Sequence, residues 1–498
     1  MERTERAGAR EWLGLAVLAL PTLLLSVDAT VLYLALPHLG ADLRPSGAET
    51  LWIIDVYGFM IAGFLITMGT LGDRIGRRKL LLIGALAFGA ASVAAAYATD
   101  PAMLIGARAL LGIAGATLMP STLALITNMF HDAGQRGVAI AVWAACFSVG
   151  VAAGPLIGGA LLELFWWGSV FLLAVPVMVL LLVAAPILLP ESRDPDPGRI
   201  DLVSVLLSLA AILPVIYGLK VVAADGLGLG AIAAIVVGLG LAVVFVRRQK
   251  SLPDPLLDVR LFSRPAFLGA LLALLVGLAV VGVVYMFVTQ YLQMVEGHSP
   301  LAAGLWLLPS AVAMIASSMV APALAKRVAP GKLVAAALAV SAVGYLLLVF
   351  VDGPGGLALV VTGLVVVYLG IGPMMALGTE LVVGAAPAER AGSAAAMSET
   401  SMEFGLALGV AVLGSVGTAV YRSQLPEGVP ADAVESLAGA LAVGGADVVE
   451  AARSAFTSGL NVVGLVGAVA TVAIAVVTAV LVRGSSAERE IPAEKSNA

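Results

Sequence analysis

Charged residues are scarce in this chain of 498 residues: only 12% are Asp, Glu, Lys or Arg, whereas 61% are hydrophobic. Soluble domains carry roughly 25% charged residues and fewer than half apolar ones. The composition therefore excludes a soluble globular protein and predicts an integral membrane protein. The formal net charge of −5 is small, so we expect no nucleic-acid partner.

Cysteine, histidine and the motifs of enzymes are also almost absent. The single cysteine, Cys146, excludes an internal disulfide and a cysteine-based metal site. Gly331-Lys332 is followed by Leu333 and lacks the upstream glycine of a phosphate-binding loop, so we expect no ATP hydrolysis. The three histidines lie at the ends of apolar segments, where a solvated loop role is ordinary. We therefore predict no enzyme activity, no metal site and no cofactor.

Long apolar runs are what the chain has instead. A membrane-spanning helix needs about 20 apolar residues, and 14 segments meet that requirement. The first is too long for a signal peptide, and continuous rather than alternating runs exclude a β-barrel. The predicted fold class is an all-α membrane protein, with spans at 13–37, 50–71, 80–98, 102–127, 137–161, 167–189, 201–222, 228–246, 266–292, 301–325, 333–351, 357–384, 392–421 and 457–482.

Lysine and arginine set the predicted orientation of these spans. With the N-terminus in the cytoplasm, most of the 27 Lys and Arg residues fall in cytoplasmic loops and tails. Both termini are therefore expected to be cytoplasmic in a multi-pass protein of the cytoplasmic membrane. The acidic segment 423–455 then falls outside.

Two polar linkers divide the spans into groups of six, two and six. This division predicts two six-helix bundles with a two-helix insertion between them, a plan common among transporters with a midplane cavity. The predicted parts are an N-terminal bundle (1–190), a linker with an inserted hairpin (191–265), a C-terminal bundle (266–482) with the extracellular loop 423–455, and a tail (483–498).

The loop between the second and third spans reads GTLGDRIGRRK. Its basic residues fit any positive-inside loop, but its order of glycines and charges is a more specific signal. The glycines permit a tight turn between helices, and Asp73 can cap a helix or pair with an arginine. We interpret the loop as a gating motif made of Gly69, Gly72, Asp73, Arg74, Gly76, Arg77 and Arg78.

Two further motifs lie inside spans. Arg108 in the fourth span is costly in a bilayer, about 2.5–3.5 kcal/mol on insertion scales, and either snorkels to the outer end or serves function. The fifth span reads SVGVAAGPLIGGALLE, whose glycines at spacing four also occur in ordinary close-packed membrane helices. The residues of interest there are Gly150, Gly154, Pro155, Gly158 and Gly159.

Acidic residues inside spans are the main functional candidates. Asp28 and Asp55 lie in the first two spans, Glu380 lies near the cytoplasmic end of the twelfth, and Glu399 and Glu403 share one helix face at i,i+4. Such residues are expensive in lipid and should face a cavity. A carboxyl group deprived of water holds its proton more tightly, and a nearby cation favours its release. These five acids are therefore predicted to bind protons or cations.

Aromatic side chains near these acids could make cation–π contacts with lipophilic cations. The alternatives are an interfacial belt or plain helix packing. The predicted pocket aromatics are Tyr33, Tyr57, Phe404, Trp52, Trp143 and Trp306.

The gating loop resembles the signature loop of the major facilitator superfamily, in which it latches the two bundles together in one access state. The span 5 motif resembles the one that marks exporter branches of that superfamily. Nearly the whole chain, including PESRDPDPG, DPLLDVRLF and AERAGSAAAMSET, is similar to fourteen-span drug:proton antiporters, especially quaternary-ammonium-compound efflux pumps of Gram-positive and actinobacterial type. Two positions depart from the staphylococcal pumps: Met314 replaces an aspartate linked with divalent cations, and Ser398-Glu399 replaces paired glutamates.

The resemblance and the acids together imply a proton-coupled multidrug exporter of lipophilic, mainly monocationic compounds, working as a monomer among membrane lipids and driven by the proton gradient. An alternative is a dedicated exporter of one antibiotic or natural product for self-resistance. A nutrient importer is disfavoured by the span 5 motif, and a non-transporting membrane protein would leave the intramembrane acids unexplained.

Overall fold

The structure, a computed structural model, describes residues 7–193, 201–226, 228–252, 255, 257, 259–386 and 391–481. Over these residues it is helical without strands, and 14 helices are long and apolar enough to cross a membrane. The predicted fold class and number of spans are confirmed. The predicted tail 483–498 and parts of both polar linkers, including much of PESRDPDPG and DPLLDVRLF, lie outside the described residues, as does the beginning of AERAGSAAAMSET.

The first bundle contains six spans. They are α1 (Ala9–Leu43), α2 (Gly47–Ile75), α3 (Arg77–Ala96), α4 (Pro101–Met129), α5 (Ala133–Leu164) and a sixth span broken into α6 (Ser169–Leu172) and α7 (Ala174–Leu188). Helix α1 packs on α5, α4 and α7, while α4 also packs on α2 and α3.

The second bundle follows the 3-10 turn η1 (Leu261–Ser263). Its spans are α10 (Pro265–Gln290) with the π-helical turn η2 (Tyr291–Val295), α11 (Pro300–Ala325), α12 (Pro330–Leu348), α13 (Leu357–Gly384), α14 (Ala391–Gly409) continued by the π-helical turn η4 (Val410–Gly414) and α15 (Ser415–Ser423), and α18 (Ala446–Leu481). Helix α13 packs on α10, α11 and α12, and α18 packs on α10 and α12.

Local sequence explains where several helices begin. Ser46 caps α2 by accepting a hydrogen bond from the Glu49 backbone N–H, and the Glu49 carboxylate in turn accepts a hydrogen bond from the Ser46 backbone N–H. Asp100 and Ser299 cap α4 and α11, each followed by a proline at the first helical position. Proline suits that position because its missing N–H would have no partner there.

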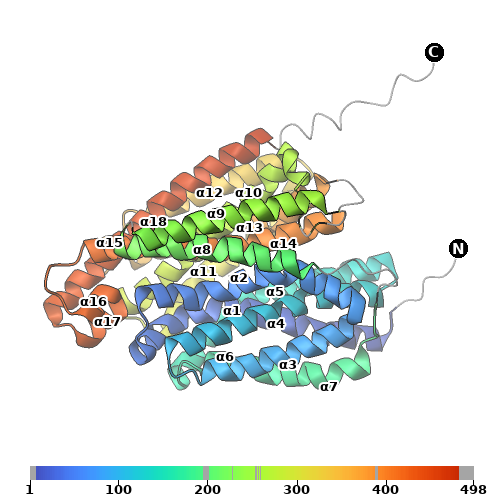
Figure 1. The fold of residues 1–498 in the computed structure, drawn as a ribbon, viewed down its shortest axis with the longest axis horizontal. Helices are drawn as coiled ribbons and strands as arrows, with labels where there is room; N and C mark the ends of the chain where they lie inside the picture. Colours follow the sequence, from blue (N-terminus) through green and yellow to red (C-terminus); the bar gives the residue numbers. More distant parts are fainter. Residues whose placement is uncertain are drawn as a thin grey trace, which may run out of the picture.

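The inserted hairpin consists of α8 (Leu202–Asp225) and α9 (Leu229–Ser251), which pack on each other. Figure 1 shows them lying across both bundles. Helix α8 contacts α2 of the first bundle and α15 and η4 of the second. Helix α9 is the more exposed of the two: only 17% of its apolar, membrane-spanning stretch is buried inside the protein, against 33% for α8. One face of α8 is therefore part of the protein interior, whereas α9 mostly faces outward.

The segment 423–455, predicted as a loop from its polar composition, is largely helical. It contains α16 (Ala431–Glu435), α17 (Leu437–Val443) and the first turns of α18, which begins at Ala446. Hydropathy alone marks only the apolar part of α18, so it misses a helix that extends beyond the membrane span. We call the end of the molecule that carries α16 and α17 the distal end, and the opposite end, where α1 begins and α18 ends, the terminal end (Figure 1).

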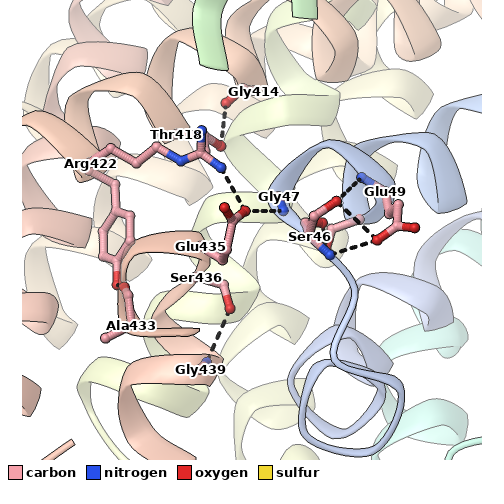
Figure 2. Close-up of polar contacts among 12 residues, drawn as sticks. Ser46, Gly47, Glu49, Gly414, Thr418, Arg422, Ala433, Glu435, Ser436 and Gly439 are labelled. Carbon is pink, nitrogen blue, oxygen red and sulfur yellow. Dashed lines mark hydrogen bonds and ion pairs between the residues drawn. The ribbon is translucent and has the colours of Figure 1, made fainter. Parts of the chain in front are cut away.

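Polar contacts join the two bundles at the distal end. Figure 2 shows Glu435 of α16 between the first residue of α2 and a side chain of α15. A Glu435 carboxylate oxygen lies 2.7 Å from Arg422 Nη2 and accepts a hydrogen bond from the Gly47 backbone N–H at 3.2 Å. Tyr421 donates a 2.6 Å hydrogen bond to the Ala433 carbonyl oxygen, which holds α16 against α15.

The first and tenth helices add to this junction. Gln293 donates to the Leu34 carbonyl oxygen at 3.1 Å, and Thr289 donates to that of Tyr33 at 3.4 Å. Both bonds lie in the distal halves of α1 and of the α10–η2 helix. Toward the terminal end the two bundles diverge (Figure 1).

Candidate substrate cavity and its acids

A central cavity of about 190 Å³ lies where the two bundles meet. Its wall comes from α1, α2, α4 and α5 on one side and α10, α11, α13, α14 and η4 on the other. Most of the wall is apolar. The polar and charged side chains that line it are Thr30, Tyr33, Asp55, Tyr57, Arg108, Tyr285, Ser318, Tyr368 and Glu403.

Asp28 is paired with the arginine of the fourth span. Arg108 Nη1 lies 3.0 Å from Asp28 Oδ2, and Arg108 Nε donates a 3.1 Å hydrogen bond to the Ile53 carbonyl oxygen. The guanidinium carbon also lies 4.4 Å from the centre of the Tyr57 ring. Three partners thus stabilise an arginine that is only 3% exposed, which is how a buried charge is tolerated. Arg108 does not snorkel.

Asp55 is paired with a residue that sequence reasoning missed. Lys220 of α8 places its Nζ 2.6 Å from Asp55 Oδ2, and the two side chains are 2% and 0% exposed. Lys220 Nζ also lies 4.3 Å from the centre of the Trp52 ring. A lysine within the apolar run LPVIYGLKVVAAD carries the same insertion cost as Arg108, and that cost was the signal that could have identified it.

Glu399 and Glu403 differ from the two aspartates because neither has an ion-pair or hydrogen-bond partner within the described part of the chain. Glu403 lines the central cavity. Glu399 lies one helical turn nearer the terminal end on the same face of α14, as the i,i+4 spacing predicts. Glu380 is exposed near the end of α13 and does not line the central cavity, and its predicted role stays a prediction.

The predicted aromatics divide into three groups. Tyr33 and Tyr57 line the central cavity. Phe404 lines a second cavity, and Trp52 covers Lys220. Trp143 and Trp306 lie elsewhere: Trp143 donates to Thr122 at 3.3 Å, and Trp306 is 42% exposed.

Two cavity tyrosines were not singled out from the sequence. Tyr285 and Tyr368 come from α10 and α13, and they continue from Tyr33 as a row of rings that crosses between the bundles. The ring centres of Tyr33 and Tyr285 are 5.5 Å apart, and those of Tyr285 and Tyr368 are 6.5 Å apart. The row supplies electron-rich ring faces to the cavity that Glu403 also lines, a surface suited to an aromatic cation.

The second cavity, of about 270 Å³, lies between the hairpin and the bundles. Its wall includes Leu209 and Ile212 of α8, Phe245 of α9 and Phe404 of α14. Phe59 and Phe404, with ring centres 6.0 Å apart, both line it. Their neighbours in sequence, Gly58 and Glu403, line the central cavity, so the α2–α14 contact separates the two.

The glycines of the fifth span act by close packing. A methyl group at Gly150 or Gly154 would collide with Ser26 or Thr30 of α1, and one at Gly159 would meet the backbone of Leu301 in α11. Helix α5 therefore packs tightly against α1 of its own bundle and against α11 of the other. Gly158 lies against α1, and Gly304 of α11 packs closely against the backbone carbonyl of Pro155.

Several residues of the gating loop contact one another, the end of the first bundle and the start of the linker that follows it. Asp73 pairs with Arg77 at 2.5 Å, which is one of the two roles that the sequence allows for Asp73. Arg78 donates to the Leu189 carbonyl at 2.9 Å, and its backbone N–H donates to Glu191 at 3.0 Å. Gly76 has φ of +111°, a backbone conformation that favours glycine, and lies against Glu191. Gly69, Gly72 and Arg74 lie in the last turns of α2.

Two helical bundles that enclose a cavity with buried acids define a membrane transporter of the two-bundle kind. The sequence profile described as "Major Facilitator Superfamily" matches residues 18–410, and the chain belongs to that family of transporters. It is therefore a multi-pass membrane protein.

Similar proteins agree with this assignment. The chain is 44% identical to "Multidrug efflux pump LfrA" of Mycolicibacterium smegmatis, over 96% of this chain and 98% of the relative. It is 36% identical to "Methyl viologen resistance protein SmvA" of Salmonella typhimurium, over 85% and 86%. Among solved structures, a bacterial homologue of the human lysosomal transporter Spinster superposes with a TM-score of 0.70 at 17% identity, covering 98% of this chain and all of that one, which shows the shared fold.

Proposed function

We propose that this protein is a proton-coupled multidrug antiporter that exports lipophilic, mainly monocationic compounds, such as quaternary ammonium compounds and dyes, across the cytoplasmic membrane. The observation that carries the proposal is Glu403, a carboxyl group without a partner in the described part of the chain that lines a cavity rich in tyrosine. An efflux-pump relative at 44% identity supports the direction of transport.

Exchange follows from competition for one carboxyl group. In the empty cavity Glu403 holds a proton, because an unpaired charge away from water is costly. A bound cation provides the missing countercharge, with its rings against Tyr33 and Tyr285, and the proton leaves. Because the same group cannot hold both, one proton moves inward for each monocation that moves outward. Glu399, one turn toward the terminal end, then lies on the path of the proton or of the cation.

The direction follows from the orientation that the positive residues favour, with both termini in the cytoplasm. In that orientation the distal end, where Glu435 joins the bundles, faces outward and is closed. The cavity then loads substrate from the cytoplasmic side. Rocking of the bundles about the α2–α14 and α5–α11 contacts would open the distal end in turn. We further propose that one chain works as a monomer among lipids, because it contains the whole cavity.

Inverted membrane vesicles test the proposal. Ethidium accumulation is followed after a pH gradient is imposed, and the gradient is then collapsed with a proton–potassium exchanger. We expect accumulation that stops when the gradient collapses. Transport that continues unchanged would contradict proton coupling, and transport of one compound alone among many tested would favour a dedicated exporter.

A further inference from the structure

The inserted hairpin supplies a positive charge to the wall of the central cavity. Asp55 lines that cavity, whereas Lys220, its partner at 2.6 Å, approaches from α8. Apart from this ion pair, no hydrogen bond within the described residues satisfies either Asp55 oxygen or Lys220 Nζ. Lys220 is thus what compensates Asp55 in this structure.

Asp55 and Trp52 together form a cation site, and the ammonium group of Lys220 fills it. A carboxylate at 2.6 Å and an indole ring whose centre lies 4.3 Å away surround the Lys220 ammonium. A carboxylate and an aromatic face are also the groups that recognise a quaternary ammonium ligand. Lys220 therefore occupies, from outside the cavity wall, the place that a second positive charge of a substrate would take.

The Lys220–Asp55 pair changes the number of uncompensated charges along the cavity wall. Arg108 cancels Asp28, and Lys220 cancels Asp55, so Glu403 is the uncompensated acid among the charged residues that line the cavity. One uncompensated acid matches one positive charge. A second positive charge would enter a low-dielectric site without a countercharge, which is unfavourable.

We propose that Lys220 is a specificity-determining residue: by neutralising Asp55, it restricts the cavity to substrates with one positive charge. This inference rests on the proposed cationic substrates. Removal of the lysine charge frees Asp55 to bind a second positive charge. The hairpin therefore contributes to substrate selection as well as to packing.

The test compares binding of a monocation, tetraphenylphosphonium, with binding of a dication, methyl viologen, to the purified full-length protein in lipid nanodiscs without a pH gradient. We expect Lys220→Gln to shift the ratio of the two dissociation constants at least tenfold in favour of the dication. Lys220→Arg, which keeps the charge, should leave the ratio unchanged. Adding Asp55→Asn to Lys220→Gln should restore the wild-type ratio.

A purely structural ion pair makes a different prediction. In that case Lys220→Gln lowers stability but leaves the ratio unchanged, and this result would overturn the inference. If Lys220→Gln does not fold, Asp55→Asn decides, because it leaves the lysine uncompensated: we expect it to weaken dication binding at least threefold more than monocation binding. An equal effect on both would also overturn the inference.

The outcome is separable from the proposed function. The ratio is measured without a proton gradient, so a wild type that binds monocations but fails to exchange them for protons contradicts only the coupling. An unchanged ratio in a protein that does exchange them contradicts only the role of Lys220. A wild type that binds neither probe overturns the proposed cationic substrates, and the inference with them.

Discussion

The buried acids of the two bundles differ in whether a cationic side chain lies beside them. In the first bundle Asp28 and Asp55 each lie within 3.0 Å of a cationic nitrogen, from Arg108 and Lys220. In the second, Glu399 and Glu403 have no such partner among the described residues. An acid beside a fixed cation already has its countercharge, whereas an acid without one can take its countercharge from a ligand. The proposed exchange of a proton for a cation therefore takes place at the acids of the second bundle, whereas the acids of the first bundle are already held in ion pairs.

Neutralising the unpaired acid in the cavity should have the largest effect. Glu403→Gln keeps the shape of the side chain but cannot release a proton or countercharge a cation. We expect gradient-driven ethidium uptake by inverted vesicles to fall to the level of vesicles without the protein. Glu399→Gln should lose less, about tenfold, because Glu399 does not line the central cavity.

The matched control is Glu450→Gln, which makes the same change at an exposed residue near the start of α18. It should transport at the wild-type rate. Near-normal uptake by Glu403→Gln would contradict the proposal that the unpaired acids of the second bundle carry out the exchange.

Breaking a paired acid should instead destabilise the fold. Arg108→Met leaves Asp28 without a countercharge, and loss of one partner of a buried pair costs about 3–5 kcal/mol. We expect a clear drop in the thermal unfolding midpoint, and recovery of most of it in the double variant Asp28→Asn with Arg108→Met. Glu403→Gln should not lower the midpoint. Equal destabilisation by Arg108→Met and by the double variant would mean that the pairing is not what matters.

The distal junction should have a smaller, conformational effect. Glu435→Gln weakens the contacts with Arg422 and with the start of α2 (Figure 2), so the state with an open distal end becomes more populated. With Cys146 replaced by serine, a cysteine at Gln290, beside this junction, reports the change. We expect labelling by a membrane-impermeant maleimide to become a few times faster, and an unchanged rate would show that Glu435 does not hold the bundles together.

The smallest effect concerns Asp201, which caps α8 outside the membrane span. Burial alone raises its pKa, but hydrogen bonds from Ser204 and Arg248 outweigh burial and lower the pKa of Asp201 below its usual value. A lowered pKa contributes stability above the usual value, about 4, which is lost as the pH falls through the lowered pKa.

Wild type should therefore unfold at a slightly higher temperature than Asp201→Asn near neutral pH, by less than about 1 kcal/mol in free energy because Arg248 is partly exposed. The difference should shrink as the pH falls through the lowered pKa of Asp201 and the carboxylate takes up a proton. A difference that grows on acidification would contradict this sign.

Sequence reasoning identified the spans, because each is encoded by a continuous apolar run. It also placed Glu399 and Glu403 on one face, since i,i+4 spacing is local. It could not find the partners of the aspartates, because Asp28 and Arg108 are on different helices and Asp55 pairs with the inserted hairpin. Periodicity does not say which face of α11 meets lipid, so Trp306 was predicted to line the pocket although it is 42% exposed.

The most direct test of the central claim is a measurement of proton release. Tetraphenylphosphonium is added to purified protein in weakly buffered solution, and a pH indicator records the protons freed per cation bound. The exchange at Glu403 predicts about one proton per cation for wild type and none for Glu403→Gln. Release by Glu403→Gln equal to that of wild type, or binding by wild type without release, would contradict it.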